Sequence, residues 1–214
     1  MTSRTLVSAA ALLCMLFLGF GRAQAQDARK IIENVQEAYD DLSDATLTFN
    51  QSVRFKVSRA EQSVKGTLHF KKPNKYRIET DERTVVTDGT TSWSFNTKTR
   101  QVVIDAYKAA SHALSPEQLL LNYPKDFYST LVGEETVGKQ RCHVLRLTPK
   151  EDNTFATGMK IWVGKDWFIR KIEISDVNGA TTTYVIDAIQ VDQKQPDSRF
   201  VFQIPDKAEV IDLR

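Results

Sequence analysis

Residues 64–77, VKGTLHFKKPNKYR, decide the fold, because they contain one complete β-strand, a tight turn and the start of a second strand. Small or apolar residues at the even positions 64–70 alternate with polar residues at the odd positions 65–71. Such alternation is typical of an antiparallel strand with one buried and one solvated face. His69 belongs to the polar set, so we expect a solvated imidazole there. Pro73-Asn74 suits the centre of the turn that precedes Tyr76.

The period of two continues on both sides of this stretch and predicts a series of strands. Asp88-Gly89 and Asn178-Gly179 stand between such runs and are strong hairpin signals. The further strands expected are Leu47–Val57, Thr84–Val86, Ser92–Phe95, Gln101–Asp105, Phe127–Leu131, Arg141–Thr148, Met159–Val163, Trp167–Ile174, Thr183–Val191 and a last short one at Phe200–Ile204.

Only two segments have a helical period. Residues 27–42 carry Ile31, Ile32, Val35 and Tyr39 at three- and four-residue spacing. A short helix is expected over residues 115–122, with a serine cap followed by proline. Many consecutive strands with two helices favour one large curved sheet or open barrel over a sandwich.

The first 25 residues have the pattern of a cleaved secretion signal. Arg4 precedes an uncharged apolar run of about 16 residues, shorter than the roughly 20 that span a bilayer. Ala23-Gln24-Ala25 then supplies the small-x-small cleavage pattern. A lipoprotein signal is disfavoured, because Cys14 lies inside the apolar run. We therefore expect cleavage near Ala25 and a soluble mature protein that functions outside the cytoplasm.

Composition gives little indication of a charged partner or of catalysis. The signal holds two of the 29 basic residues and none of the 27 acidic ones, which leaves equal numbers and disfavours nucleic acid. Cys142 is then the one remaining cysteine, so no internal disulfide can form, and we expect it buried. The three histidines are scattered and no Gly-x-Ser-x-Gly elbow is present. No catalytic residue, metal or cofactor is predicted.

The prominent feature is apolar. Large apolar residues occupy the expected inward positions of the strands: Phe49, Phe55, Leu68, Phe70, Trp93, Phe95, Ile161, Ile172 and Ile174. A curved sheet with two helices has little helical material to fill its concave face. These side chains either pack together or leave an apolar cavity for a ligand, and periodicity does not decide between the two.

Several stretches, taken in order, resemble the family of periplasmic outer-membrane lipoprotein carrier proteins, LolA. Residues 66–77 carry most of the specificity, and Phe49-x-Gln51 precedes them. Thr87-Asp88-Gly89 follows, with Trp93 and Phe95 beyond it. Weaker agreement comes from residues 142–149, 161–163 and 200–205. Together they span nearly all of the mature chain.

The resemblance implies a mainly β fold for residues 26–214, a single domain: an unclosed antiparallel barrel of about 11 strands, with helices forming a lid over an apolar cavity. It implies a monomer that takes the acyl chains of lipoproteins from an inner-membrane transporter to an outer-membrane acceptor, without cofactor. The cavity-lining residues implied are Phe49, Phe55, Leu68, Phe70, Tyr76, Ile78, Trp93, Phe95, Ile161, Ile172 and Ile174.

The lid implied by the resemblance consists of Leu119, Leu120 and Leu121 with the first helix. The family often has arginine before the turn proline, where it is thought to hold the lid closed; this chain has Lys72. Lysine is a point charge without the planar donor fork of arginine, so we expect a looser lid.

Three other kinds of protein compete with the carrier. A lipid-sensing or regulatory module of the same fold would bind a ligand without delivering cargo. An acceptor would need a lipidatable cysteine at its mature start. An enzyme on a β scaffold would need acid–base residues that only the fold brings together.

Overall fold

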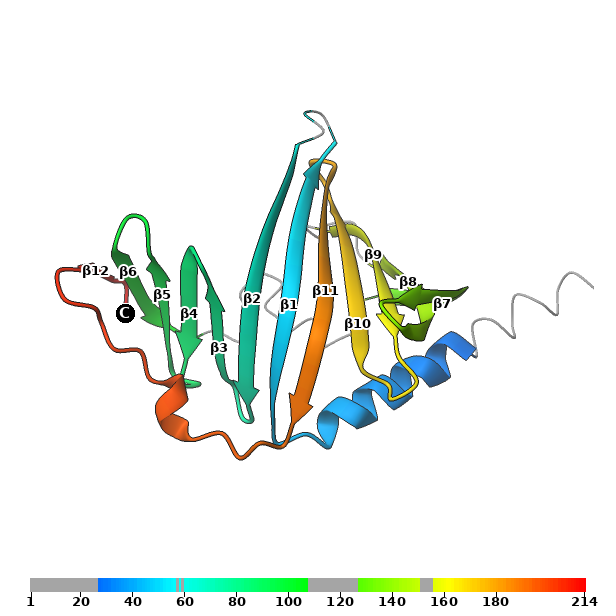
Figure 1. Ribbon diagram of the computed structural model, residues 1–214, viewed down its shortest axis with the longest axis horizontal. Helices are drawn as coiled ribbons and strands as arrows, with labels where there is room; N and C mark the ends of the chain where they lie inside the picture. The colour runs from blue at the N-terminus through cyan, green and yellow to red at the C-terminus, as the bar shows by residue number, and fades with distance from the viewer. Residues whose placement is uncertain (1–26, 57, 59, 108–126, 151–155) are drawn as a thin grey trace, which may run out of the picture.

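The computed structural model describes residues 27–56, 58, 60–107, 127–150 and 156–214. Residues 27–40 form a helix, and twelve strands join in one sheet (Figure 1). The strands are β1 (Asp44–Phe55), β2 (Glu61–Lys71), β3 (Lys75–Thr80), β4 (Arg83–Thr87), β5 (Thr91–Asn96), β6 (Gln101–Ala106), β7 (Phe127–Val137), β8 (Gln140–Pro149), β9 (Ala156–Val163), β10 (Ile169–Asp176), β11 (Ala180–Val191) and β12 (Glu209–Asp212).

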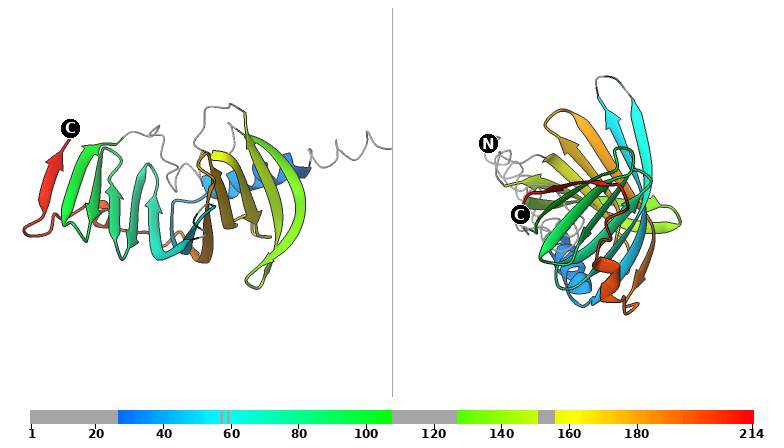
Figure 2. Two further views of the ribbon diagram at one scale, coloured as in Figure 1. Left: turned by 90° about the horizontal axis from the view of Figure 1, so that it is seen from above. Right: turned by 90° about the vertical axis from the view of Figure 1, so that its left-hand side faces the viewer.

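The sheet is continuous, with the strand order β12-β6-β5-β4-β3-β2-β1-β11-β10-β9-β8-β7. From β1 the chain runs to one side through β6, and β7 to β11 then return from the opposite edge until β11 pairs with β1. All pairs are antiparallel except β12 with β6. The sheet curls, but its edge strands β12 and β7 do not pair with each other (Figure 2). The unclosed, barrel-like β fold is thus confirmed, with twelve strands and one helix among the described residues.

The predicted hairpins form as the turn residues indicate. The Asp88 carboxylate accepts the backbone N–H groups of Thr90 and Thr91, both at 2.8 Å, and Gly89 has a φ of 93°. Gly179 adopts a φ of 76° in the turn between β10 and β11. Left-handed backbone of this kind has no steric cost for glycine, which explains why these two positions carry it.

One face of the sheet packs against the helix, and we call it the inner face. Leu47 of β1 lies opposite Leu68 of β2, which lies opposite Ile78 of β3. Ile172 of β10 lies opposite Ile161 of β9, and both join the same cluster of buried residues as the helix. The two halves of the chain therefore contribute to a single core on this face.

The end of the chain differs from the prediction. The strand expected at Phe200–Ile204 is wrong: a 3-10 turn, η1 (Asp197–Phe200), is followed by irregular backbone, and the last strand is β12. Residues 192–200, which we call the strap, lie on the outer face of the sheet. Phe200 is fully buried there and not part of any ladder. Phe200 is apolar because it packs in the interior, and in the sequence this gives the same signal as a buried strand residue. That explains why the sequence predicts a strand here.

Several element boundaries also differ; β7, for example, continues to Val137 and does not end at Leu131. The helix ends at residue 40 and not at 42, and β10 begins at Ile169 because Trp167 has a left-handed φ of 63° in the preceding turn. The predicted short helix at 115–122 and the signal segment lie outside the described residues.

Candidate functional site

The candidate site is the apolar inner face of the sheet. Six of the predicted cavity-lining residues lie in its buried cluster, each at most 8% exposed: Phe49, Leu68, Phe70, Ile161, Ile172 and Ile174. Tyr76 and Ile78 are partly buried and pack against the same cluster. The structure thus brings together eight residues that are spread over more than 120 positions of the chain.

Trp93 and Phe95 do not join this cluster, which corrects the prediction that they share its face. Ile78 is opposite Val85, and Val85 is opposite Ser94, so the serine faces inward. Trp93 and Phe95, its neighbours in β5, therefore point to the outer face. There Phe95 packs against Phe202, with ring centroids 5.9 Å apart.

Phe55 is also apart from the cluster. It lies on the same side of β1 as Phe49, six residues along the strand and opposite Ala180. Its exposure is 39%, because β1 extends beyond the packed part of the inner face. It is at most a marginal member of the site.

Close packing between β1 and β2 depends on Gly66. A Cβ at this position would lie 2.5 Å from the Cζ atom of Phe49 and 2.9 Å from the carbonyl oxygen of Glu79. The Phe49 ring thus occupies the space that any other side chain at position 66 would need. The sequence suggests the strand, but the reason for its glycine is this tertiary contact.

The helix covers part of the inner face with its apolar side. Ile31, Ile32 and Val35 are at most 7% exposed. Tyr39 is buried as well, and its ring meets Phe168 edge to face with centroids 5.4 Å apart. Burial raises the pKa of the Tyr39 hydroxyl.

Sequence reasoning missed further apolar residues of this face. They are Leu47, Leu145, Leu147, Met159, Tyr184, Ile186 and Ile189. The alternation within β8 and β11 was the available signal, because Leu145 and Leu147 lie two positions apart, as do Tyr184 and Ile186.

Lys72 connects the β2–β3 turn to the end of the helix. Its Nζ atom donates to the carbonyl oxygens of Tyr39 at 2.8 Å and of Asp40 at 2.6 Å. These carbonyls belong to the last helical turn, where intrahelical donors are missing and a positive charge is favourable. Lys72 therefore fastens the helix to the sheet. Leu119, Leu120 and Leu121, the other predicted lid residues, lie outside the described residues.

The polar residues of the described ranges form no metal centre. No group of three or more His, Cys, Asp or Glu side chains there is arranged to hold a metal ion. Cys142 is buried, as expected, and burial raises the pKa of its thiol. No helix among the described residues has the length and apolar character needed to cross a membrane.

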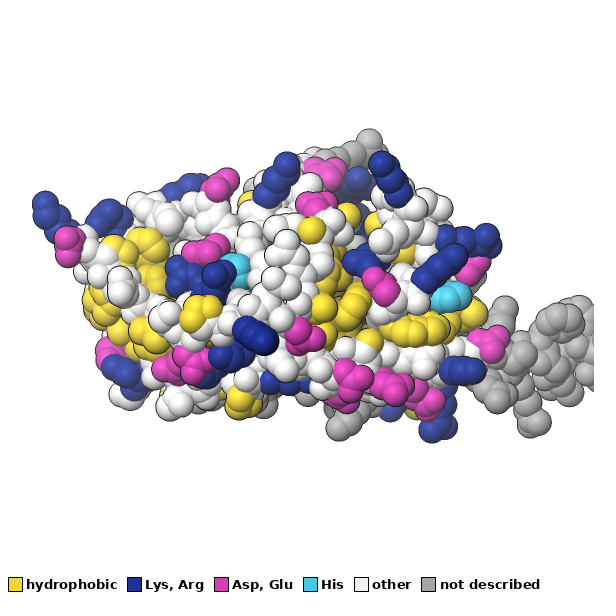
Figure 3. Space-filling model, turned by 60° about the horizontal axis from the view of Figure 1, so that its bottom comes forward, with side chains coloured by type: hydrophobic (Ala, Val, Ile, Leu, Met, Phe, Trp, Pro, Cys, Tyr) yellow, Lys and Arg dark blue, Asp and Glu magenta, His cyan; other side chains and the backbone are white. Residues whose placement is uncertain are grey.

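His69 is buried and not solvated, contrary to the prediction. Its exposure is 8%, since the strap crosses the polar face of β2. Basic side chains gather beside a histidine on this face of the molecule (Figure 3). No local pattern in β2 could have indicated a cover that comes from more than 120 residues away.

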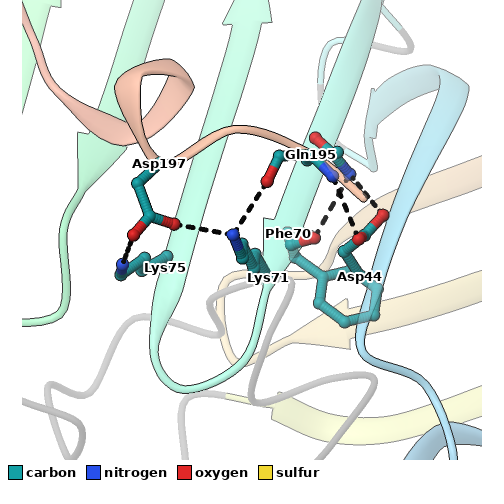
Figure 4. A network of polar contacts seen from close by, with 6 residues as sticks. All are labelled: Asp44, Phe70, Lys71, Lys75, Gln195 and Asp197. Carbon is teal, nitrogen blue, oxygen red and sulfur yellow. Dashed lines mark hydrogen bonds and ion pairs between the residues drawn. The ribbon is translucent and has the colours of Figure 1, made fainter. Parts of the chain in front are cut away.

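The strap is fixed by polar contacts at the ends of β1 and β2 (Figure 4). The buried Asp44 carboxylate accepts the backbone N–H of Gln193 at 2.9 Å and that of Gln195 at 3.1 Å. The Gln195 side chain donates to the carbonyl of Ala45 at 2.9 Å. Lys71 donates to the carbonyl of Gln195 at 2.8 Å, and its ammonium group also pairs with the carboxylate that follows at position 197.

Comparison with known proteins gives a family match over most of the chain. The sequence profile described as outer membrane lipoprotein carrier protein LolA matches residues 40–203. This range contains the strands of the apolar inner face and the whole strap, but not the helix before residue 40 or β12.

Individual relatives are distant. An outer-membrane lipoprotein carrier protein of Glaesserella parasuis is 25% identical over 206 residues, covering 95% of each chain. An uncharacterised protein of Methanocaldococcus jannaschii is 27% identical over 199 residues, and the match covers 89% of this chain but 56% of that longer protein. Among solved structures, an uncharacterised conserved protein of Thermus thermophilus has a TM-score of 0.55 at 13% identity, covering 87% of this chain and 99% of that one. It shares the fold alone.

Proposed function

Since this chain belongs to the family of outer-membrane lipoprotein carrier proteins, LolA, we propose that it binds the acyl chains of lipoproteins on the inner face of its sheet and carries them between membranes. The observation that carries this proposal is the continuous apolar face to which both halves of the chain contribute. Such a face offers an acyl chain many carbon contacts and few polar groups, as lipid sites require.

The energetics require that binding be offset by lost contacts. Burying an acyl chain is worth about 0.8 kcal/mol per methylene, so two or three fully buried chains would exceed ~20 kcal/mol. That is at the ceiling of non-covalent affinity, and release would be too slow for a carrier. Some of this free energy therefore has to be spent on breaking contacts within the protein.

The helix supplies contacts of the right size. Ile31, Ile32 and Val35 are buried against the inner face, and each buried aliphatic side chain stabilises by about 1.5–3 kcal/mol. If acyl chains displace the helix, roughly 5–9 kcal/mol of protein contacts is lost. In this proposal the helix is the described part of the lid, and Lys72 holds it closed.

The wider cycle is part of the same proposal. The chain is secreted after cleavage near Ala25, acts as a monomer in the periplasm without a cofactor, receives cargo from an inner-membrane transporter and delivers it to an outer-membrane acceptor. It performs no catalysis.

A matched pair of variants tests the site. Ile78 and Phe95 are both half-buried, but Ile78 faces inward and Phe95 outward. We expect Ile78→Gln to weaken binding of a fluorescent triacylated lipopeptide about tenfold, because a polar amide then faces the acyl chains. Phe95→Gln should leave this affinity within twofold.

The controls separate binding from folding. Circular dichroism and urea unfolding establish that both variants are folded at the assay temperature, and the same peptide without acyl chains serves as the ligand control. Equal binding of the acylated and unacylated peptide, or equal loss in the two variants, would contradict the proposed site.

A further inference from the structure

The outer face of the sheet carries a polar cleft that the carrier function does not use. Between β2, β3 and the strap lies a cleft of about 400 Å³. It is lined by His69, Arg77, Glu79, Pro196, Ser198 and Arg199. His69 and Arg77 lie opposite each other in the β2–β3 register, so these side chains share the face opposite to Leu68 and Ile78.

Positive charge in the cleft is only partly compensated. Arg77 donates through Nη2 to the Glu79 carboxylate at 2.8 Å, which pairs one guanidinium with one carboxylate. Arg199 has no carboxylate within ion-pair distance in the part of the chain that the structure describes. Its Nη1 atom lies 3.1 and 3.2 Å from the two ring nitrogens of His69. The cleft therefore holds two guanidinium groups against one carboxylate.

The backbone and side chains hold the two arginines in place. Arg77 Nη1 donates to the carbonyl oxygen of Arg199 at 3.5 Å, which joins the strap to β3. The strap itself is anchored by Asp44 and Lys71 on either side of Gln195. Because the anchors at Asp44 and Lys71 lie outside the cleft lining, they position the strap in addition to the contacts of Arg77 and Arg199 within the cleft.

We propose that this cleft binds a phosphate group carrying a single negative charge, held by Arg199 and Arg77 with the Ser198 hydroxyl as a further donor. Guanidinium groups bind phosphate oxygens through paired N–H donors. The Glu79 carboxylate in the lining disfavours a second negative charge on the ligand. A phosphodiester meets these conditions, whether it belongs to a lipid headgroup or to a free soluble molecule.

Protonation of His69 is coupled to this binding. Burial and the Arg199 guanidinium lower the pKa of His69, so the ring is neutral at neutral pH. The groups that interact with it are Thr46 from β1, Arg77 and Glu79 from β3, and Gln195 and Arg199 from the strap. The charged pair Asp44 and Lys71 lies two positions away from Thr46 and His69 in the β1–β2 register. A bound anion offsets the repulsion between His69 and Arg199, so affinity should rise as pH falls.

The test is a nuclear magnetic resonance titration at constant ionic strength. The probes are glycerophosphoglycerol, a soluble phosphodiester, and inorganic phosphate, each at pH 7.5 and 5.5. We expect saturable shifts at the Ser198 amide and the arginine side chains, with the diester tighter than inorganic phosphate at pH 7.5. Arg199→Gln should weaken binding about tenfold, whereas Arg54→Gln, at an exposed arginine of β1, should change it less than twofold.

A second variant keeps the test decisive if Arg199→Gln perturbs the strap. Ser198→Glu retains both arginines but adds a carboxylate to the cleft, and it should abolish diester binding. Vesicles of phosphatidylglycerol then distinguish a lipid headgroup from a soluble ligand. A lipid headgroup is supported if the protein binds these vesicles more tightly than phosphatidylcholine vesicles and loses this binding in Ser198→Glu. A soluble ligand is supported if the protein binds the diester but not the vesicles. No saturable shift, tighter binding of inorganic phosphate at pH 7.5, or equal responses in all variants would overturn the proposal.

Discussion

Replacing Lys72 by methionine tests whether the β2–β3 turn holds the helix against the sheet. Methionine keeps an unbranched side chain of similar length but has no donor. The carbonyl oxygens of Tyr39 and Asp40 would then lose an ammonium group at 2.8 and 2.6 Å. Lys72→Arg, by contrast, keeps the charge and adds donors, so it should hold the helix at least as well.

The expected magnitude follows from the two contacts. A hydrogen bond to a charged group contributes about 1.5–3 kcal/mol, and a cation at a helix C-terminus about 0.3–1 kcal/mol. The lysine is half-buried and one ammonium serves both carbonyls, so the contributions do not add. We expect a loss of about 2 kcal/mol, which is roughly a 30-fold rise in the population with a detached helix.

Hydrogen exchange measured by mass spectrometry provides the assay. Amides of the helix should exchange about 30-fold faster in Lys72→Met, while those of β1 serve as the internal reference for global unfolding. Lys75→Met is the matched control, because Lys75 pairs with Asp197 of the strap at 3.1 Å and not with the helix. If helix amides exchange at the wild-type rate in Lys72→Met, the assigned role of Lys72 is refuted.

Three further predictions concern stability. Asp44→Ala should lower the free energy of unfolding by about 3 kcal/mol in urea titrations, because it leaves the strap amides at residues 193 and 195 without their acceptor, and a loss below 1 kcal/mol would contradict the anchoring role. Gly66→Ala should destabilise by about 1–3 kcal/mol through its clash with Phe49, and Phe49→Leu in the same chain should recover part of this loss, as a double-mutant cycle would measure. Because the pKa of His69 is lowered in the folded state, the unfolded chain binds more protons there, so stability is retained above the ordinary histidine pKa of about 6.5 and lost as pH falls below it. This acid-side loss should be smaller in His69→Gln between pH 7 and 5, and identical pH dependence in the two proteins would exclude the histidine as its source.

Local sequence patterns were sufficient for most of the strands, for the hairpins and for eight residues of the inner face. Alternation within β2 correctly assigns Leu68 and Phe70 to the buried side, and the Asp88-Gly89 turn forms where expected. These features are determined over a few residues, because a strand alternates its side chains by geometry and a tight turn needs particular backbone angles. The family resemblance rests on the same segments.

Only the tertiary structure decided which faces coincide and what covers them. A period of two places Trp93 and Phe95 on the same side of β5, but it does not decide which face of the sheet that side joins. A one-residue shift in the pairing of a strand with its neighbour moves all of its side chains to the other face. The register across β3, β4 and β5 puts both aromatic residues outward. The burial of His69 depends on contacts with Arg199, 130 residues away. The sequence by itself therefore determined a curved sheet of alternating strands, whereas the charged cleft on its outer face arises from long-range packing that no local period encodes.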